Sequence, residues 1–202
     1  MQIYETRTAP NPRRVRIFLA EKEIPMTYVQ VDMLKGEQFT PEFRTRNALA
    51  QVPVLELDDG SYLSESVAIC RYFEEIQPDP PLFGRTPREK AEIEMWNRRV
   101  ELNFLFPTGM CFQHTHPFFK PFKPQVPEWG ELSRARAEAF LTVLNTQLGQ
   151  HPFVAGTHYS IADITALCTL DFARVIQLRI KAEHTHLQRW HQTVSQRPSA
   201  NA

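Results

Sequence analysis

Residues 47–75 read NALAQVPVLELDDGSYLSESVAICRYFEE, and this stretch decides the fold. Two apolar runs, VPVLEL (52–57) and SYL (61–63), lie on either side of Asp58-Asp59-Gly60. An Asp-Gly pair between two strand-like runs is typical of a β-hairpin, because both residue types tolerate the backbone angles of a tight turn. We therefore expect two antiparallel strands here.

A change of hydrophobic period follows the hairpin. Apolar residues recur at Ile69, Tyr72, Phe73 and Ile76, which is the spacing of one face of an α-helix. Ser64 precedes them and is a residue type that caps helix N-termini. The stretch therefore predicts a helix that is capped by Ser64.

Upstream of this stretch, the pattern predicts two more strands. Residues 2–6 (QIYET) alternate in polarity, and MTYVQVD (26–32) has a similar pattern. Between them, Asn11 suits an N-cap, Pro12 suits the first helical position, and an apolar face continues to about Lys22. Two strands joined through a helix imply a parallel pair with a right-handed crossover.

A short helix is predicted from Thr40-Pro41 to about Arg46. The resulting order β-α-β-α-β-β-α is that of a thioredoxin-like domain, which has a mixed sheet with helices on both faces. We place this domain at residues 1–78. Residues 79–87 belong to a proline-rich stretch and predict a linker.

Residues 88–202 show helical periodicity and no strand alternation, and the last helix is predicted at about 185–196. Residues 106–129 contain five prolines and five phenylalanines, so we expect a structured aromatic loop or a helix that breaks up. The predicted fold class is therefore α/β plus all-α: an N-terminal thioredoxin-like domain followed by a C-terminal helical bundle.

The composition limits the possible function classes. The 23 basic and 23 acidic residues give a formal net charge of zero, which argues against binding to nucleic acid or to an anionic membrane. No apolar run is long enough to cross a bilayer, and the first residues lack the pattern of a signal peptide. Three well-separated cysteines, Cys70, Cys111 and Cys168, favour buried thiols in a reducing cytoplasm.

Four segments, in order, resemble the cytosolic-type glutathione S-transferases. They are RRVRIFLAEKEI (13–24), residues 47–75, YSIADI (159–164) and RWHQTVSQRPS (189–199). The resemblance covers nearly the whole chain. It implies a glutathione transferase with glutathione as co-substrate, no other cofactor and no metal, a small apolar electrophile, a role in detoxification, and a homodimer.

The resemblance also implies a glutathione site. A cis peptide at Val52-Pro53 would turn the Val52 backbone toward an extended peptide, with Gln51 beside it. At the start of the following helix, the Ser66 hydroxyl and N–H would hold the γ-glutamyl carboxylate, and Glu65 would hold the ammonium group. Arg13, Arg14 and Arg16 cluster at the first helix, and we expect most of them to form a solvated face and salt bridges. In a functional role, Arg13 or Arg14 would lie near the carboxylate or the sulfur of glutathione.

The turn TAPNPRRV (8–15) departs from most of the family, because it contains no Tyr, Ser or Cys. It resembles a bacterial and fungal branch with the pattern A-P-N-x-R-[RK]-V-R. A free thiol is only a few per cent ionised at neutral pH, so a donor to the sulfur is still required. The candidates are the Asn11 side chain, the Arg13 backbone N–H, and His114 from the aromatic segment.

Two other motifs receive structural interpretations. Ser160 and Asp163 have the spacing of a capping box, so Asp163 is predicted to support folding and not catalysis. His114 and His116 lack the further ligands that a metal site needs.

Other functions remain open. A glutathione-dependent isomerase uses the same scaffold, but the double-serine turn of that type is absent here. A non-catalytic binding or regulatory protein is the alternative from another class.

Overall fold

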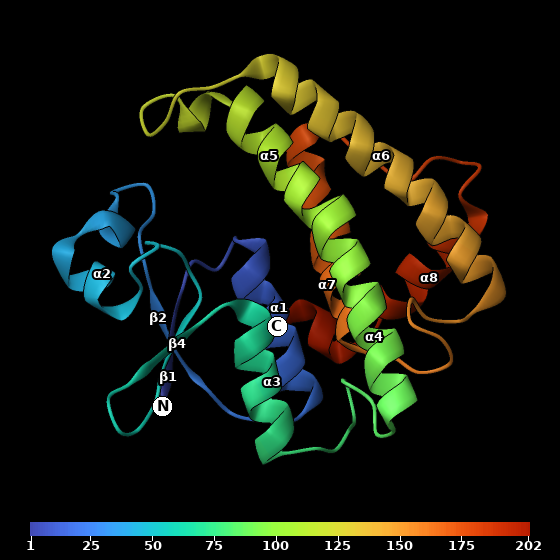
Figure 1. Cartoon of the computed structure of the whole chain (residues 1–202), viewed down its shortest axis with the longest axis horizontal. Helices are drawn as coiled ribbons and strands as arrows, with labels where there is room; N and C mark the ends of the chain where they lie inside the picture. Colours follow the sequence, from blue (N-terminus) through green and yellow to red (C-terminus); the bar gives the residue numbers. More distant parts are fainter. The chain divides into compact units, whose positions relative to one another are not determined.

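The computed structural model describes residues Met1–Ala202, which fold into two compact units. Unit 1 comprises Met1–Leu82 together with Pro198–Ala202, and unit 2 comprises Phe83–Arg197. Figure 1 colours both units along the chain. None of the helices combines the length and the apolar composition that a membrane span requires.

Unit 1 is built on a four-stranded mixed sheet with the order β2-β1-β3-β4. Its strands are β1 (Gln2–Glu5), β2 (Thr27–Gln30), β3 (Val54–Glu56) and β4 (Tyr62–Ser64). β1 and β2 pair in parallel, whereas β1–β3 and β3–β4 are antiparallel. The predicted hairpin and the predicted parallel pair are both confirmed.

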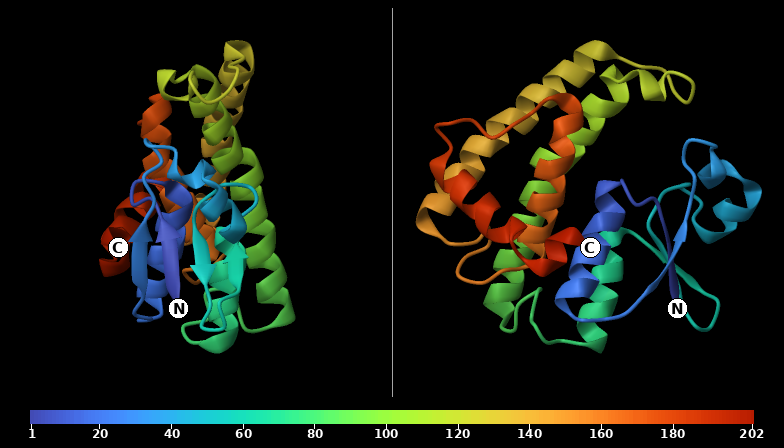
Figure 2. Two further views of the ribbon diagram at one scale, coloured as in Figure 1. Left: turned by 90° about the vertical axis from the view of Figure 1, so that its left-hand side faces the viewer. Right: turned by 180° about the vertical axis from the view of Figure 1, so that it is seen from behind.

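Helices cover both faces of this sheet, as the two views of Figure 2 show. They are α1 (Pro10–Glu21), α2 (Pro41–Arg46), which follows a short 3-10 turn, and α3 (Ser66–Ile76). Tyr4 and Val54 are cross-strand partners and pack with Phe43 of α2 on one face. The next pair, Ile3 and Leu55, is fully buried on the opposite face, because side chains alternate along a strand.

Two predicted helix starts were wrong. α1 begins at Pro10 with Ala9 as its N-cap, so Asn11 is the second helical residue and not the cap. α3 begins at Ser66 with Glu65 at the cap position, because Ser64 still pairs with Val54 in β4. Pro10 and Pro12 both suit a first turn, so the sequence pattern did not distinguish between the two possible starts of α1.

Residues 198–202 belong to unit 1, whereas the sequence pattern predicted them in the helical domain. They form a 3-10 turn, η5 (Pro198–Asn201), that contacts α1. Arg13 donates a 3.0 Å hydrogen bond to the carbonyl of Ala200, and the Ser199 hydroxyl bonds Glu21. These polar contacts explain why the segment packs with α1.

Unit 2 is helical, as predicted. Its longer helices are α4 (Pro87–Val100), α5 (Phe106–Thr115), α6 (Pro127–Gln150), α7 (Ile161–Phe172) and α8 (Thr185–Ser195). Shorter turns are η2 (Glu101–Leu105), η3 (Pro117–Phe119) and η4 (Ala173–Ile176). Every residue from Ile161 to Leu170 is buried, so α7 is the central helix of this unit.

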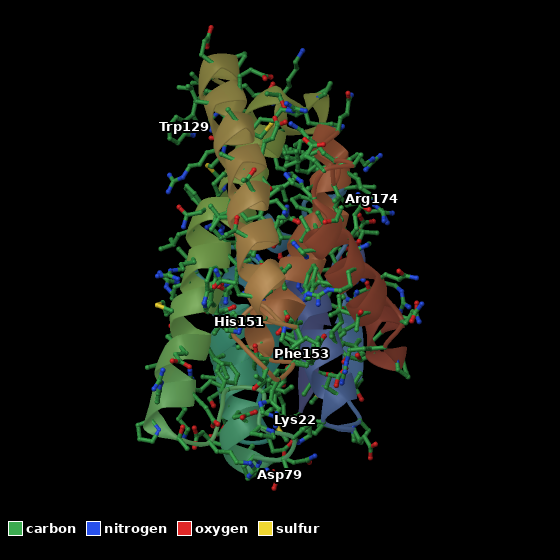
Figure 3. All side chains as sticks on the ribbon, turned by 90° about the vertical axis from the view of Figure 1, so that its right-hand side faces the viewer. Lys22, Asp79, Trp129, His151, Phe153 and Arg174 are labelled. Atoms are coloured by element: carbon green, nitrogen blue, oxygen red, sulfur yellow. The ribbon has the colours of Figure 1, made fainter.

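The aromatic segment 106–129 is a helix that breaks up. Helix continues from α4 through the π-turn η2 into α5, and it ends at Thr115. Pro107 has no N–H for an ordinary helical bond, and the π-turn directly before it accommodates this loss. α6 then runs from Pro127 to Gln150, with Trp129 in its first turn and His151 just beyond its end (Figure 3).

The predicted capping box at the start of α7 is confirmed. Asp163 accepts hydrogen bonds from the N–H and hydroxyl of Ser160, and also from Val154 N–H and the Trp190 indole. Burial raises the pKa of Asp163 to about 6, although these donors act in the opposite direction. Asp163 therefore joins α7 to α8 and to the preceding loop.

Candidate functional site

The turn before β3 exposes one backbone edge of unit 1. The Val52-Pro53 peptide is cis, as the resemblance predicted. Val52 is buried, and neither its N–H nor its carbonyl has a hydrogen-bond partner within the chain. A backbone N–H or carbonyl normally has a partner, so the edge of Val52 is suited to a backbone-like ligand.

Asn47 holds this turn in place, a role that was not predicted from the sequence. Its side-chain amide donates 2.9 Å to the Gln51 carbonyl, and its side-chain oxygen accepts 3.1 Å from Leu49 N–H. Ala50 lies between them with φ +55. This left-handed angle explains why the family pattern has glycine at that position, and it could have been read from the pattern.

The start of α3 forms the second part of the site. Glu65 has φ +69 and ψ 110, an unusual conformation for a non-glycine residue, and it makes no side-chain cap. Ser66 is the first helical residue and is only 6% exposed. The first N–H groups of a helix have no intrahelical acceptor, so this uncapped start can bind an anion.

The turn at the start of α1 offers few donors. Pro10 and Pro12 have no N–H, and Arg13 N–H already bonds the Ala9 carbonyl at 3.2 Å. Arg13 N–H was one of three candidate donors to the sulfur, and this helical bond occupies it. The backbone N–H and the exposed side chain of Asn11 remain at this end of the helix.

The arginines of α1 do not form the solvated face that we expected. Arg14 and Arg16 are 2% and 5% exposed, respectively, and are therefore buried. Arg16 pairs with Glu5 and donates 2.8 Å to the Arg7 carbonyl, so the salt-bridge part of the prediction is confirmed for this residue. Arg14 donates 3.0 Å to the Ser66 hydroxyl, which connects α1 to the start of α3.

His114 lies in α5 of unit 2, and His116 caps the end of that helix. The Nδ1 atom of His114 accepts a 3.0 Å hydrogen bond from Val126 N–H. The neutral ring must therefore carry its proton on Nε2, which is a donor. His116 uses its own Nδ1 to accept a bond from Phe118 N–H.

The phenylalanines of this segment pack against one another. The ring of Phe112 lies 5.0 Å from that of Phe119 and 5.5 Å from that of Phe172, edge to face in both pairs. Phe118 and Phe122 continue the cluster at 5.5 Å. This cluster favours a packing role for these rings within unit 2.

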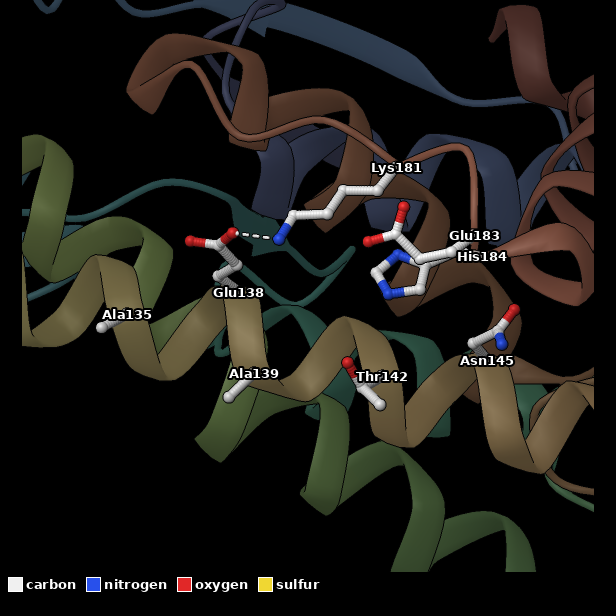
Figure 4. A pocket seen from close by; sticks show the side chains of 8 residues that line it. All are labelled: Ala135, Glu138, Ala139, Thr142, Asn145, Lys181, Glu183 and His184. Atoms are coloured by element: carbon white, nitrogen blue, oxygen red, sulfur yellow. Dashed lines mark ion pairs between the residues drawn. The ribbon is translucent and has the colours of Figure 1, made fainter.

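A pocket of 480 Å³ lies elsewhere in unit 2, between α6 and residues 181–184 (Figure 4). Glu138 and Lys181 form a 2.8 Å ion pair across it. None of the sequence-predicted site residues lines this pocket. No group of three or more His, Cys, Asp or Glu side chains is arranged to hold a metal ion.

Unit 1 thus brings together part of the predicted set. Ser66 is bonded to a neighbour from α1, and Gln51 and Val52 share the turn before β3. The side chain of Arg13 is engaged with residue 200, and His114 belongs to unit 2.

Known proteins resemble both units. A family model described as the glutathione S-transferase N-terminal domain matches residues 8–76, and one described as the C-terminal domain matches residues 127–193. Glutathione S-transferase 2 of Saccharomyces cerevisiae is 40% identical over 98% of this chain and 87% of its own length. The crystal structure of Gtt2 from Saccharomyces cerevisiae has a TM-score of 0.95 and covers 100% of this chain and 99% of that chain.

Relatives of a second kind are longer than this chain. Elongation factor 1-gamma 2 of Oryza sativa is 32% identical over 85% of this chain, which corresponds to 41% of that protein.

Proposed function

Because the chain belongs to the glutathione S-transferase family, we propose that unit 1 binds glutathione along the Val52 turn and the start of α3. The chain is a glutathione transferase, and the family uses glutathione as a substrate. The observation that carries the proposed binding mode is the backbone of Val52, whose N–H and carbonyl have no hydrogen-bond partner in the chain.

In this proposal, the cysteinyl part of glutathione pairs with the Val52 backbone as if it added a strand. Its γ-glutamyl carboxylate meets the Ser66 N–H and hydroxyl, and Glu65 faces its ammonium group. Gln51 lies beside the peptide. Arg13 contributes only if its guanidinium reaches the ligand in addition to the Ala200 carbonyl.

The chemical task is to stabilise the thiolate. Lowering a thiol pKa by about two units requires roughly 2.7 kcal/mol of preferential stabilisation. A helix N-terminus supplies about 0.3–1 kcal/mol, and up to about 2 kcal/mol in favourable geometry. We assign the remainder to the Asn11 side chain and N–H and to the Nε2–H of His114, acting directly or through water.

The proposal also covers the second substrate, the cellular role, the oligomeric state and the location of the protein. We infer a small apolar electrophile, a role in detoxification, and a homodimer. The exposed apolar side chains of Leu102 and Phe106, in η2 and α5, support the homodimer. Three buried cysteines that form no disulfide support a cytoplasmic location.

Steady-state conjugation of glutathione to chlorodinitrobenzene tests the activity, and calorimetric titration with glutathione tests the binding. We expect saturable binding and a rate above that of the uncatalysed reaction. Binding without turnover of any aryl halide or epoxide would favour the non-catalytic alternative.

That alternative has two specific observations in its favour. The α1 turn has no Tyr, Ser or Cys, and a relative of the other kind is an elongation factor subunit. The free donors of Asn11 and the uncapped start of α3 favour the enzyme. A glutathione-dependent isomerase stays the lesser alternative, because its double-serine turn is absent.

A further inference from the structure

We propose that Arg14 is a positioning residue for glutathione binding: it orients the Ser66 hydroxyl so that this hydroxyl donates to the γ-glutamyl carboxylate. This inference rests on the proposed glutathione site. It extends that site to a buried side chain on another helix, which acts through Ser66.

The direction of one hydrogen bond carries the argument. The Arg14 guanidinium lies 3.0 Å from the Ser66 oxygen, and both residues are buried. Arginine has no acceptor, so Arg14 donates and the Ser66 oxygen accepts. The single hydroxyl proton of Ser66 must therefore point away from Arg14.

That proton has no acceptor among the protein's own atoms. The only hydrogen bond that the Ser66 side chain makes within the chain is the one from Arg14. Serine in the first helical turn commonly bonds a nearby backbone group, but α3 starts at Ser66 with no side-chain cap. An oxygen placed at this helix start would thus receive the hydroxyl proton together with the free N–H groups.

Burial of Arg14 fixes the orientation of the Ser66 hydroxyl. Arg14 is held in the interior between α1 and α3, which pack against each other. A planar guanidinium fixes the direction of its donors better than the flexible ammonium of lysine does. Arg14 therefore converts Ser66 from a group that could accept or donate into a donor.

The test compares Arg14→Lys with Arg16→Lys by calorimetric titration with glutathione. Arg16 is a matched control, because it is buried on the same helix but bonds Glu5 and the Arg7 carbonyl. We expect Arg14→Lys to weaken glutathione binding by about tenfold or more, and Arg16→Lys to leave it near the wild-type value.

A double-mutant cycle with Ser66→Ala separates positioning from a merely structural role. In the Ser66→Ala background, Arg14→Lys should change the affinity no further, because the oriented hydroxyl is gone. The dipeptide cysteinylglycine, which lacks the γ-glutamyl group, should bind wild type and Arg14→Lys equally. Thermal unfolding checks each variant, and Arg14→Gln replaces Arg14→Lys if the latter does not fold.

Wild-type affinity in Arg14→Lys would overturn the inference, as would a loss of the same size with and without Ser66. If the wild-type protein itself did not bind glutathione, the proposed function would fail instead.

Discussion

The backbone N–H of Val126 donates a 3.0 Å hydrogen bond to the Nδ1 atom of His114. Val126 is the residue just before α6, so this bond joins the end of α5 to the start of α6. The two helices approach closely there, since a Cβ added to Gly130 would lie 2.5 Å from a side-chain carbon of Thr115. His114 is therefore held in one tautomer, with its Nε2–H as the available donor.

This relationship allows a sharp test of the His114 assignment. Asn at position 114 can place its side-chain oxygen where Nδ1 lies and still accept from Val126 N–H, but it has no group at the position of Nε2. We expect His114→Asn to lower kcat/KM for conjugation by about 100-fold, as loss of a preorganised donor typically does. His116→Asn is the control, because His116 is an exposed helix cap. Wild-type activity in His114→Asn would remove His114 from the mechanism.

Asn11→Ala separates catalysis from folding. Asn11 is exposed and is not the cap of α1, so its replacement should change the free energy of unfolding by no more than about 0.5 kcal/mol. We expect conjugation to fall by about tenfold or more, while glutathione binding changes little. Steady-state kinetics and thermal unfolding of the same sample check both statements. A large loss of stability with unchanged turnover would show that Asn11 has a structural role and not a catalytic one.

Ala50→Gly should stabilise the protein. Ala50 has φ +55, which costs a residue with a Cβ about 1–2 kcal/mol, whereas glycine adopts this angle freely. After the larger chain entropy of glycine in the unfolded state is subtracted, we expect a gain of about 0.5–1 kcal/mol.

Ala48→Gly is the matched control two residues earlier. Ala48 is exposed and has an ordinary negative φ, so glycine should destabilise the protein there. Chemical denaturation of both variants measures the difference. Equal effects at the two positions would contradict the role of the left-handed angle.

The buried carboxyl of Asp163 predicts a specific pH dependence. Its pKa is about 6 in the folded protein against an ordinary value of 3.8, so the folded state binds the proton more tightly than the unfolded state. The contribution of Asp163 to stability is therefore present in full below about pH 4 and decreases as the pH rises through 6. Relative to Asp163→Asn, the wild type should lose of the order of 3 kcal/mol between pH 4 and pH 7. A stability difference that stays constant or grows with pH would contradict the assignment.

The sequence pattern predicted those parts of the fold that depend on local periodicity and turn chemistry. The Asp-Gly turn at 59–60 predicted the β3–β4 hairpin, and the Ser160–Asp163 spacing predicted the cap of α7. Helix starts were harder, because Pro10 and Pro12 are both compatible with a first turn. The end of β4 at Ser64, one residue later than expected, depends on the register of its pairing with Val54 of β3 and so has no local signature.

The candidate site was only partly predictable for a similar reason. Val52, Glu65 and Ser66 lie in a recognisable pattern, but the burial of Arg14 does not follow from residue type, since arginine is usually exposed. Its partner Ser66 is distant in the sequence, and only the packing of α1 against α3 brings the two together. The tautomer of His114 likewise depends on a bond to the start of another helix.

The most direct test of the central claim is a titration of the glutathione thiol bound to the protein, followed by the ultraviolet absorbance of the thiolate. If Asn11, the start of α1 and His114 stabilise the thiolate, the pKa of the bound thiol should fall from about 8.5 to about 7 or below. A bound thiol whose pKa stays at the value of free glutathione would contradict the claim that this chain activates glutathione.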